Sequence, residues 1–394
     1  MKIKNEYTEE LIAPSKYNPN EFTSVGVVCF YIFMLVAFAA VPIVFGLTGV
    51  SEKLQAVAAT DYYLYAVISL CVSQGIILIS GVVFSLIKQT NPLSGGGYVF
   101  RFDFTPMLFG CALICGIQVC FSALHTEFSE SASLFGFAGA NEPFVIKGSP
   151  LWAAVYLALV PLFPCIIEEL AFRGIIMRGL NRFGGFASVV ISSAMFALFH
   201  GNTQQLILQF LGGLAIGGCV YLTGNIAQGT VMHFFNNLFA EAFSLVSALY
   251  GLSPETKSVF TVCTTLCGLT MLIIGVWYFI GYAKNVKRPF CVYSEDETTD
   301  VGRVECGYGY LYGREKKKIP VLMSSAEKNA QASIVIDISK LGLFKKYYPD
   351  AMRFKRGAFV GLNKEAKSKT LAVILIAVAI VIAAVRVAAS LFGF

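Results

Sequence analysis

Long apolar runs alternate with short polar stretches along most of the chain. Each run is close to the roughly 20 residues that a helix needs to cross a bilayer. The runs lie at residues 24–48, 63–88, 105–124, 150–180, 185–201, 205–223, 226–248, 259–283 and about 370–392. The pattern predicts an all-α polytopic membrane protein, with about eight transmembrane helices in a core over residues 23–284 and a last transmembrane helix at residues 369–394.

Two parts of the chain break the apolar pattern. Residues 1–22 form a polar N-terminal tail, and residues 285–368 form a polar, basic segment that includes the lysines at 316–318. Within this segment, residues 332–337 favour a β-strand, and residues 307–313 are rich in the Gly and Tyr typical of turns. We therefore expect either a small α/β domain or an irregular basic segment there.

Composition supports the membrane assignment, because 56% of the residues are hydrophobic and 14% are charged. Soluble domains carry roughly 25% charged residues. The net charge of +6 does not imply a nucleic-acid partner, because membrane proteins concentrate Lys and Arg in cytoplasmic segments. The positions of these residues predict a multi-pass protein of the cell membrane, with the N-terminus and residues 285–368 in the cytoplasm. The oligomeric state is not predicted.

The most unusual apolar run ends in charges, at Glu168, Glu169 and Arg173. Each such charge costs roughly 2.5–3.5 kcal/mol at mid-membrane, so charged residues there are candidates for function. On a helix, Glu169 and Arg173 are four residues apart and can form an ion pair. Glu168 is rotated away from that face and is left free for chemistry. The alternative is a helix that ends at the interface in a solvated charge cluster.

Two of the three histidines also lie in apolar runs. Phe196 and His200 are one helical turn apart, and His233 and Asn237 share a helix face in the same way. At 1.5 Å per residue, Glu168 and His200 lie about 21–24 Å from the turn between their helices, so they can face each other. A lone histidine in a span is more often a packing residue, but two histidines beside a carboxylate pair indicate a polar cluster.

Two chemistries suit such a cluster. In the first, Glu168 is a general base, His200 helps to activate a water, and His233 and Asn237 donate to an oxyanion. In the second, Glu168, His200 and His233 bind zinc, which lowers the pKa of the attacking water. No compact zinc motif such as H-E-x-x-H is present. The residues alone leave both chemistries open, and zinc is the only cofactor they suggest.

The three motifs, in this order on successive helices, resemble those of the CPBP family of intramembrane proteases, which includes the CAAX prenyl endopeptidases. The resemblance covers about residues 150–245. The motifs are Glu168-Glu169-x-x-x-Arg173, Phe196-x-x-x-His200 and His233-x-x-x-Asn237.

The resemblance implies that Glu168 and His200 activate water and that His233 and Asn237 bind the oxyanion. Glu169 is also counted among the catalytic residues, and it supports the architecture together with Arg173. Phe196 is expected to give structural support. The family is commonly labelled as metalloproteases, and a metal-free glutamate mechanism is also argued for its members. No substrate-binding residue is predicted.

The resemblance therefore implies an intramembrane endopeptidase that acts on a membrane-associated protein or peptide precursor, of the CAAX, bacteriocin or signal-peptide type. The alternative is a non-catalytic membrane protein on the same scaffold, which binds a bacteriocin for self-immunity or regulates a sensor kinase. A transporter is a weaker third reading, because the chain shows no convincing internal repeat.

Overall fold

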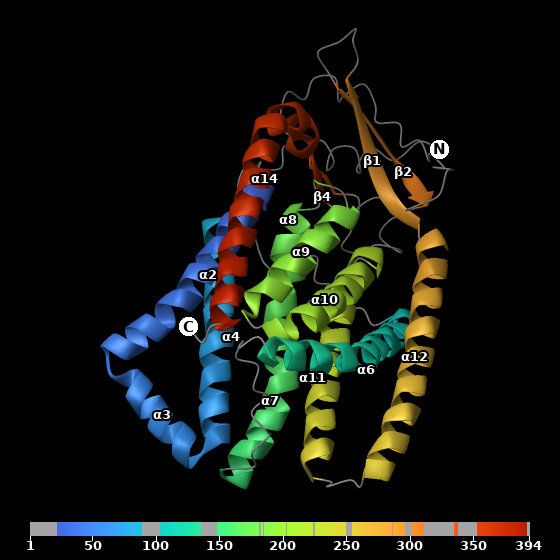
Figure 1. Cartoon of the computed structure of the whole chain (residues 1–394). Helices are drawn as coiled ribbons and strands as arrows, with labels where there is room; N and C mark the ends of the chain where they lie inside the picture. The colour runs from blue at the N-terminus through green and yellow to red at the C-terminus, as the bar shows by residue number, and fades with distance from the viewer. Residues whose placement is uncertain are drawn as a thin grey trace. The chain divides into compact units, whose positions relative to one another are not determined.

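The computed structural model describes residues 22–88, 103–134, 148–180, 183, 185–201, 203–223, 225–249, 254–285, 287–295, 302–310, 335–337 and 353–391. Most of these residues are helical (Figure 1). In chain order the helices are α2 (Ser24–Leu47), α3 (Val50–Thr60), α4 (Tyr62–Ile87), α6 (Phe104–Leu134), α7 (Pro150–Glu169), the π-helix η1 (Leu170–Met177), α8 (Arg178–Leu180), α9 (Gly185–Phe199), α10 (Thr203–Thr223), α11 (Ile226–Leu249), α12 (Pro254–Asn285) and α14 (Arg356–Leu391).

The predicted all-α polytopic membrane fold is confirmed. Each apolar run of the sequence coincides with a helix, and seven helical segments of the described chain are long and apolar enough to cross a membrane. These are α2, α4, α6, the continuous segment Pro150–Leu180, α10, α12 and α14. The helix α9 is apolar but shorter, and α11 is the helix that carries the third motif. Crossings by these two helices stay a prediction.

The expected basic segment contains strands where the structure describes it. β1 (Lys287–Glu295) pairs with β2 (Gly302–Tyr310), and β3 (Val335–Asp337) pairs with β4 (Arg353–Lys355), both in antiparallel register. Of the expected tail at residues 1–22, all but Phe22 lies outside the described residues.

The chain divides into two compact units. Ile280–Leu371 belongs to one of them, and Phe22–Phe279 with Ala372–Phe394 forms the other. The second unit contains all three motifs.

The helix α7 lies between α4 and α11 and packs against both. Its first turn is tied to that of α4 by Asp61, the N-cap residue of α4. One carboxylate oxygen of Asp61 accepts from the Leu64 amide at 3.1 Å, and the other accepts from the Ser149 amide at 3.0 Å. Capping by a carboxylate satisfies amides that have no partner within the helix. The two helices therefore begin at the same end of the unit.

Close helix contacts depend on small residues on α10. The Cα of Gly213 is so near α9 that an added Cβ would lie 3.1 Å from Ser193 Cβ, and α10 packs against both α9 and α6. On the other side of α9, one apolar cluster joins α2, η1, α9 and α14. Small residues at helix contacts let backbones approach within a membrane. This packing holds the end of α9 and the middle of η1 against each other.

Two elements were not expected from the sequence. The helix α3 occupies residues between the first two apolar runs, and η1 continues α7 directly beyond Glu169. A π-helix has i→i+5 hydrogen bonds and a wider turn than an α-helix, and it occurs often at functional sites. The segment Ala171–Met177 of η1 is buried throughout.

Candidate active site

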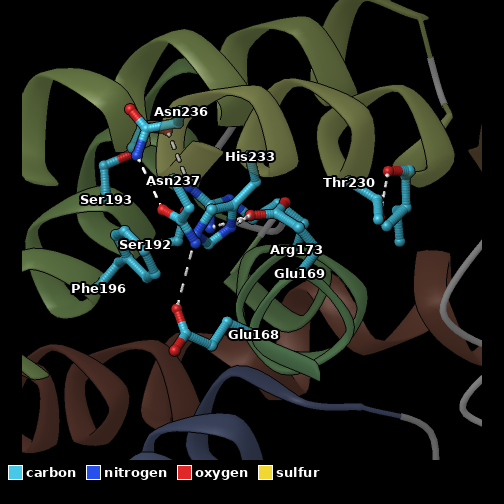
Figure 2. Close-up of polar contacts among 12 residues, drawn as sticks. Glu168, Glu169, Arg173, Ser192, Ser193, Phe196, Thr230, His233, Asn236 and Asn237 are labelled. Atoms are coloured by element: carbon cyan, nitrogen blue, oxygen red, sulfur yellow. Dashed lines mark hydrogen bonds and ion pairs between the residues drawn. The ribbon is translucent and has the colours of Figure 1, made fainter. Parts of the chain in front are cut away.

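Residues of the three sequence motifs lie together in one cluster, and Figure 2 shows Glu168, Phe196 and His233 within it. His200, which contacts Phe196, and Asn237 are half-buried. Glu168, Glu169 and Arg173 come from α7 and η1, and His233 and Asn237 come from α11. Phe196 comes from α9, and His200 directly follows that helix. Exposure is 0% for Glu169, 1% for Arg173, 2% for His233 and 6% for Glu168. Charged groups this deeply buried require partners. The alternative of a solvated charge cluster at a helix end therefore does not describe this site.

Arg173 is neutralised by Glu169, as the four-residue spacing predicts. Its Nη1 donates to Glu169 Oε1 at 2.7 Å, and its Nη2 donates to the Gly213 carbonyl at 3.3 Å. The guanidinium also lies 4.6 Å from the centre of the Phe196 ring. Arg173 thus joins η1 to α9 and α10, and its contacts are those of a residue that supports the architecture.

The same carboxylate oxygen of Glu169 also holds His233. His233 Nδ1 lies 2.9 Å from Glu169 Oε1, and Figure 2 shows the ring between the two glutamates. Because a carboxylate paired with an arginine accepts hydrogen bonds, Nδ1 carries the proton in this contact. The second ring nitrogen, Nε2, is then directed towards Glu168 and lies 3.9 Å from its Oε2. This separation is too long for a direct hydrogen bond.

Glu168 uses only one of its two oxygens. Oε1 accepts from Gln74 Nε2 at 2.7 Å, whereas Oε2 is buried without a hydrogen-bond partner among the described residues. Glu169 Oε2 and Arg173 Nε are likewise buried without a hydrogen-bond partner among the described residues. A buried polar atom without a partner is costly, and in native structures such an atom calls for an explanation. The free oxygen of Glu168 is the one that faces His233.

Gln74 is a residue that the sequence analysis missed. It lies in the middle of α4, is 5% exposed, and is the residue that orients the Glu168 carboxylate. The available signal was an amide side chain inside an apolar run, since an amide there must find a hydrogen-bond partner.

His200 lies directly after the last residue of α9. Its Nδ1 is 2.9 Å from the Phe196 carbonyl oxygen. A carbonyl only accepts, so Nδ1 donates and the neutral ring keeps Nε2 as an acceptor. The Phe196 ring contacts both histidines edge-on, with ring centroids 4.8 Å from His200 and 5.7 Å from His233. Phe196 therefore packs against His200, His233 and Arg173 at once.

Asn237 is oriented by a chain of amides that the spacing did not reveal. Gln118 of α6 donates to Asn236 Oδ1 at 2.6 Å, and Asn236 Nδ2 donates to Asn237 Oδ1 at 3.1 Å. Because the Asn237 oxygen is occupied as an acceptor, its amide nitrogen is left as a donor. Neither Gln118 nor Asn236 belongs to a four-residue motif, which is why the sequence analysis passed over them.

A zinc site does not fit the side chains present. The described residues contain no group of three His, Cys, Asp or Glu side chains placed to hold a metal ion. The suggested set of Glu168, His200 and His233 does not form such a group, so no step of the chemistry below is assigned to a metal.

Comparison with known proteins identifies a family for the segment that contains this cluster. Residues 150–239 match the family described as type II CAAX prenyl endopeptidase Rce1-like. The match covers less than a quarter of the chain, and it includes every residue of the three motifs. It confirms the assignment of this segment to the CAAX protease family and supports a membrane-embedded protease. No curated protein and no solved structure matches the chain.

Proposed function

We propose that this chain is an intramembrane endopeptidase in which Glu168 activates the attacking water. One observation carries the proposal: Glu168 Oε2 is buried, has no hydrogen-bond partner among the described residues, and lies 3.9 Å from His233 Nε2. Gln74 holds the other oxygen, so the free oxygen cannot turn away without breaking that bond. This arrangement suits a fixed general base.

The water would donate one hydrogen to Glu168 Oε2 and the other to His200 Nε2. Its oxygen then attacks the peptide carbonyl as Glu168 takes the proton, which gives a tetrahedral intermediate with a negative oxygen. Glu168 later gives that proton to the leaving amine, and the C–N bond breaks. One carboxylic acid and one amine result, and the peptide and one water are the reactants consumed.

His233 and Asn237 would stabilise the negative oxygen. The Asn237 amide nitrogen is available as a donor because Asn236 occupies its oxygen. His233 carries a proton on Nδ1 towards Glu169, and a second proton on Nε2 would let it donate into the site. The positive charge of His233 would then balance the negative charge of Glu168, because the charge of Glu169 is already balanced by Arg173. Fixed donors at a developing charge are commonly the largest contribution to catalysis.

The proposed substrate is a membrane-associated protein or peptide precursor, because the cluster lies among helices that are long and apolar enough to cross a membrane. A CAAX-type precursor and a bacteriocin or signal-peptide precursor both meet that description. We further propose the cell membrane as the location, with the N-terminus and residues 285–368 in the cytoplasm, on the basis of the flanking Lys and Arg residues.

The test compares cells that express the wild type, Glu168→Gln or Glu52→Gln at matched abundance, and maps new peptide termini by mass spectrometry. Glutamine at position 168 keeps an acceptor for Gln74 but cannot take a proton. Glu52 is exposed on α3, so its variant makes the same chemical change away from the site. Termini present with the wild type and Glu52→Gln, and absent with Glu168→Gln, are expected. Equal termini in all three would leave the binding or regulatory reading in place.

A further inference from the structure

The C-terminal helix α14 packs into the core of the helical unit, although it lies far beyond the residues that match the protease family. Its buried positions recur every three or four residues, which is the spacing of one helix face. They are Ala372, Ile376, Ala379, Ala383 and Val387. Three of the five are alanines, small residues of the kind that let helices pack closely in a membrane. Ile376, Ala379 and Ala383 belong to the apolar cluster that also includes residues of α2, η1 and α9.

Arg386 is the charged residue in the apolar part of this helix, and it reaches the end of α9. Its Nη1 donates to the Phe199 carbonyl oxygen at 3.1 Å. Its guanidinium carbon lies 5.6 Å from the centre of the Phe38 ring, which in turn packs on Phe199. The cost of a charge within this apolar helix is therefore offset in part by a carbonyl and one aromatic ring.

Gly201 provides the space for this contact. It has φ +64°, and an added Cβ would lie 2.9 Å from Arg386 Nε and 3.0 Å from Cζ. A side chain at position 201 would thus meet both a disfavoured backbone conformation and the guanidinium. The left-handed residue is a common way to end a helix, and here it also lets the arginine approach.

The bonded carbonyl belongs to the peptide that joins Phe199 to His200. The last carbonyls of a helix have no partner within it, and arginine near the C-terminus satisfies them and interacts well with the helix dipole. Phe196, one turn earlier, uses its carbonyl to hold the His200 ring. Arg386 and Phe196 therefore fix the backbone and the ring of the same histidine.

We propose that Arg386 is a positioning residue that fixes the peptide before His200 and so holds the imidazole for water activation. The expected effect on the cleavage rate rests on the proposed function. The expected effect on structure depends only on the contact between Arg386 and the end of α9. Under this proposal α14 contributes to the function of the site, although the helix lies outside the matched family segment.

The experiment uses the full chain in lipid nanodiscs, as wild type, Arg386→Ala, Arg386→Lys and Val385→Ala. Val385 neighbours Arg386 but is 62% exposed, so it controls for a change in this turn of the helix. Two quantities are measured: hydrogen exchange of the amides at residues 197–201, and cleavage of a substrate identified by the mapping of termini. For Arg386→Ala we expect at least tenfold faster exchange, and about a tenfold lower kcat with unchanged KM.

Lysine can still donate to the Phe199 carbonyl, so Arg386→Lys is expected to recover much of the rate, and Val385→Ala to match the wild type. In a His200→Ala background, Arg386→Ala should not lower the residual cleavage further, because the two residues act on one step. Two results would overturn the inference. One is unchanged hydrogen exchange at residues 197–201 in Arg386→Ala. The other is an Arg386→Ala change that lowers cleavage by the same factor in the His200→Ala background as in the wild type. If the wild type cleaves nothing, the proposed function fails, while faster exchange in Arg386→Ala still supports the positioning of His200.

Discussion

Replacing Arg173 by methionine should separate the stability of the protein from its chemistry. The substitution keeps a long side chain under Phe196 but leaves Glu169 without its cation. Both members of the pair have side chains that are 0% exposed, and removing one partner of a buried pair costs about 3–5 kcal/mol. Total stabilities are about 5–15 kcal/mol, so Arg173→Met should lower both the thermal midpoint and the amount of protein that accumulates.

The informative variant adds Glu169→Gln to Arg173→Met. A neutral pair of similar size removes the unpaired charge, so most of the lost stability should return. Activity should stay low, because His233 loses the carboxylate that it contacts at 2.9 Å. The assay is thermal unfolding in detergent, together with the cleavage rate per folded molecule.

A stable, well-folded and inactive Arg173→Met protein would refute this reasoning. It would show that Arg173 acts on the substrate or the reacting atoms and not through Glu169. A double variant no more stable than Arg173→Met would also refute it, because the cost would then lie in lost packing against Phe196 and not in the unpaired charge.

Two further predictions follow from the contacts of Glu168 and Glu169, and a third concerns zinc. Gln74→Leu removes a hydrogen bond to a charged group, worth about 1.5–3 kcal/mol, so kcat/KM per folded molecule should fall at least tenfold, whereas Gln55→Leu on the exposed side of α3 should have no effect. Gly229→Ala places a Cβ 2.5 Å from Val220 Cγ2 and 3.1 Å from Glu169 Oε2. It should cost about 1–3 kcal/mol in thermal unfolding, and Gly218→Ala, which has no atom within 4 Å, should cost little. Treatment with a zinc chelator should leave the cleavage rate unchanged, and a loss restored by added zinc would contradict the glutamate mechanism.

Hydropathy and helical spacing predicted most of the helices and one of the key contacts. Apolar length alone located the helices, because a bilayer requires about 20 apolar residues per crossing. The spacing of Glu169 and Arg173 predicted their ion pair, because residues four apart share a helix face. Such patterns report which residues lie together on one helix.

Contacts between helices were less accessible to sequence reasoning. Gln74 bonds to Glu168 across 94 positions of the chain, and Arg386 bonds to Phe199 across 187. Distance along a helix from a shared turn indicates which residues lie at a similar level, but it does not identify bonded partners on different helices. These pairs therefore appear only when the helices are packed. The π-helix η1 likewise has no pattern of residue types that distinguishes it from the α-helix that precedes it.

Both bonds to Glu169 end on the same atom. Oε1 accepts from Arg173 at 2.7 Å and from His233 at 2.9 Å, while the other oxygen faces the backbone of Gly229. An aspartate, shorter by one methylene, would withdraw this atom from both partners at once. The three residues are therefore coupled through one atom, so a change at any of them disturbs the other two. We expect relatives either to keep all three or to replace them together.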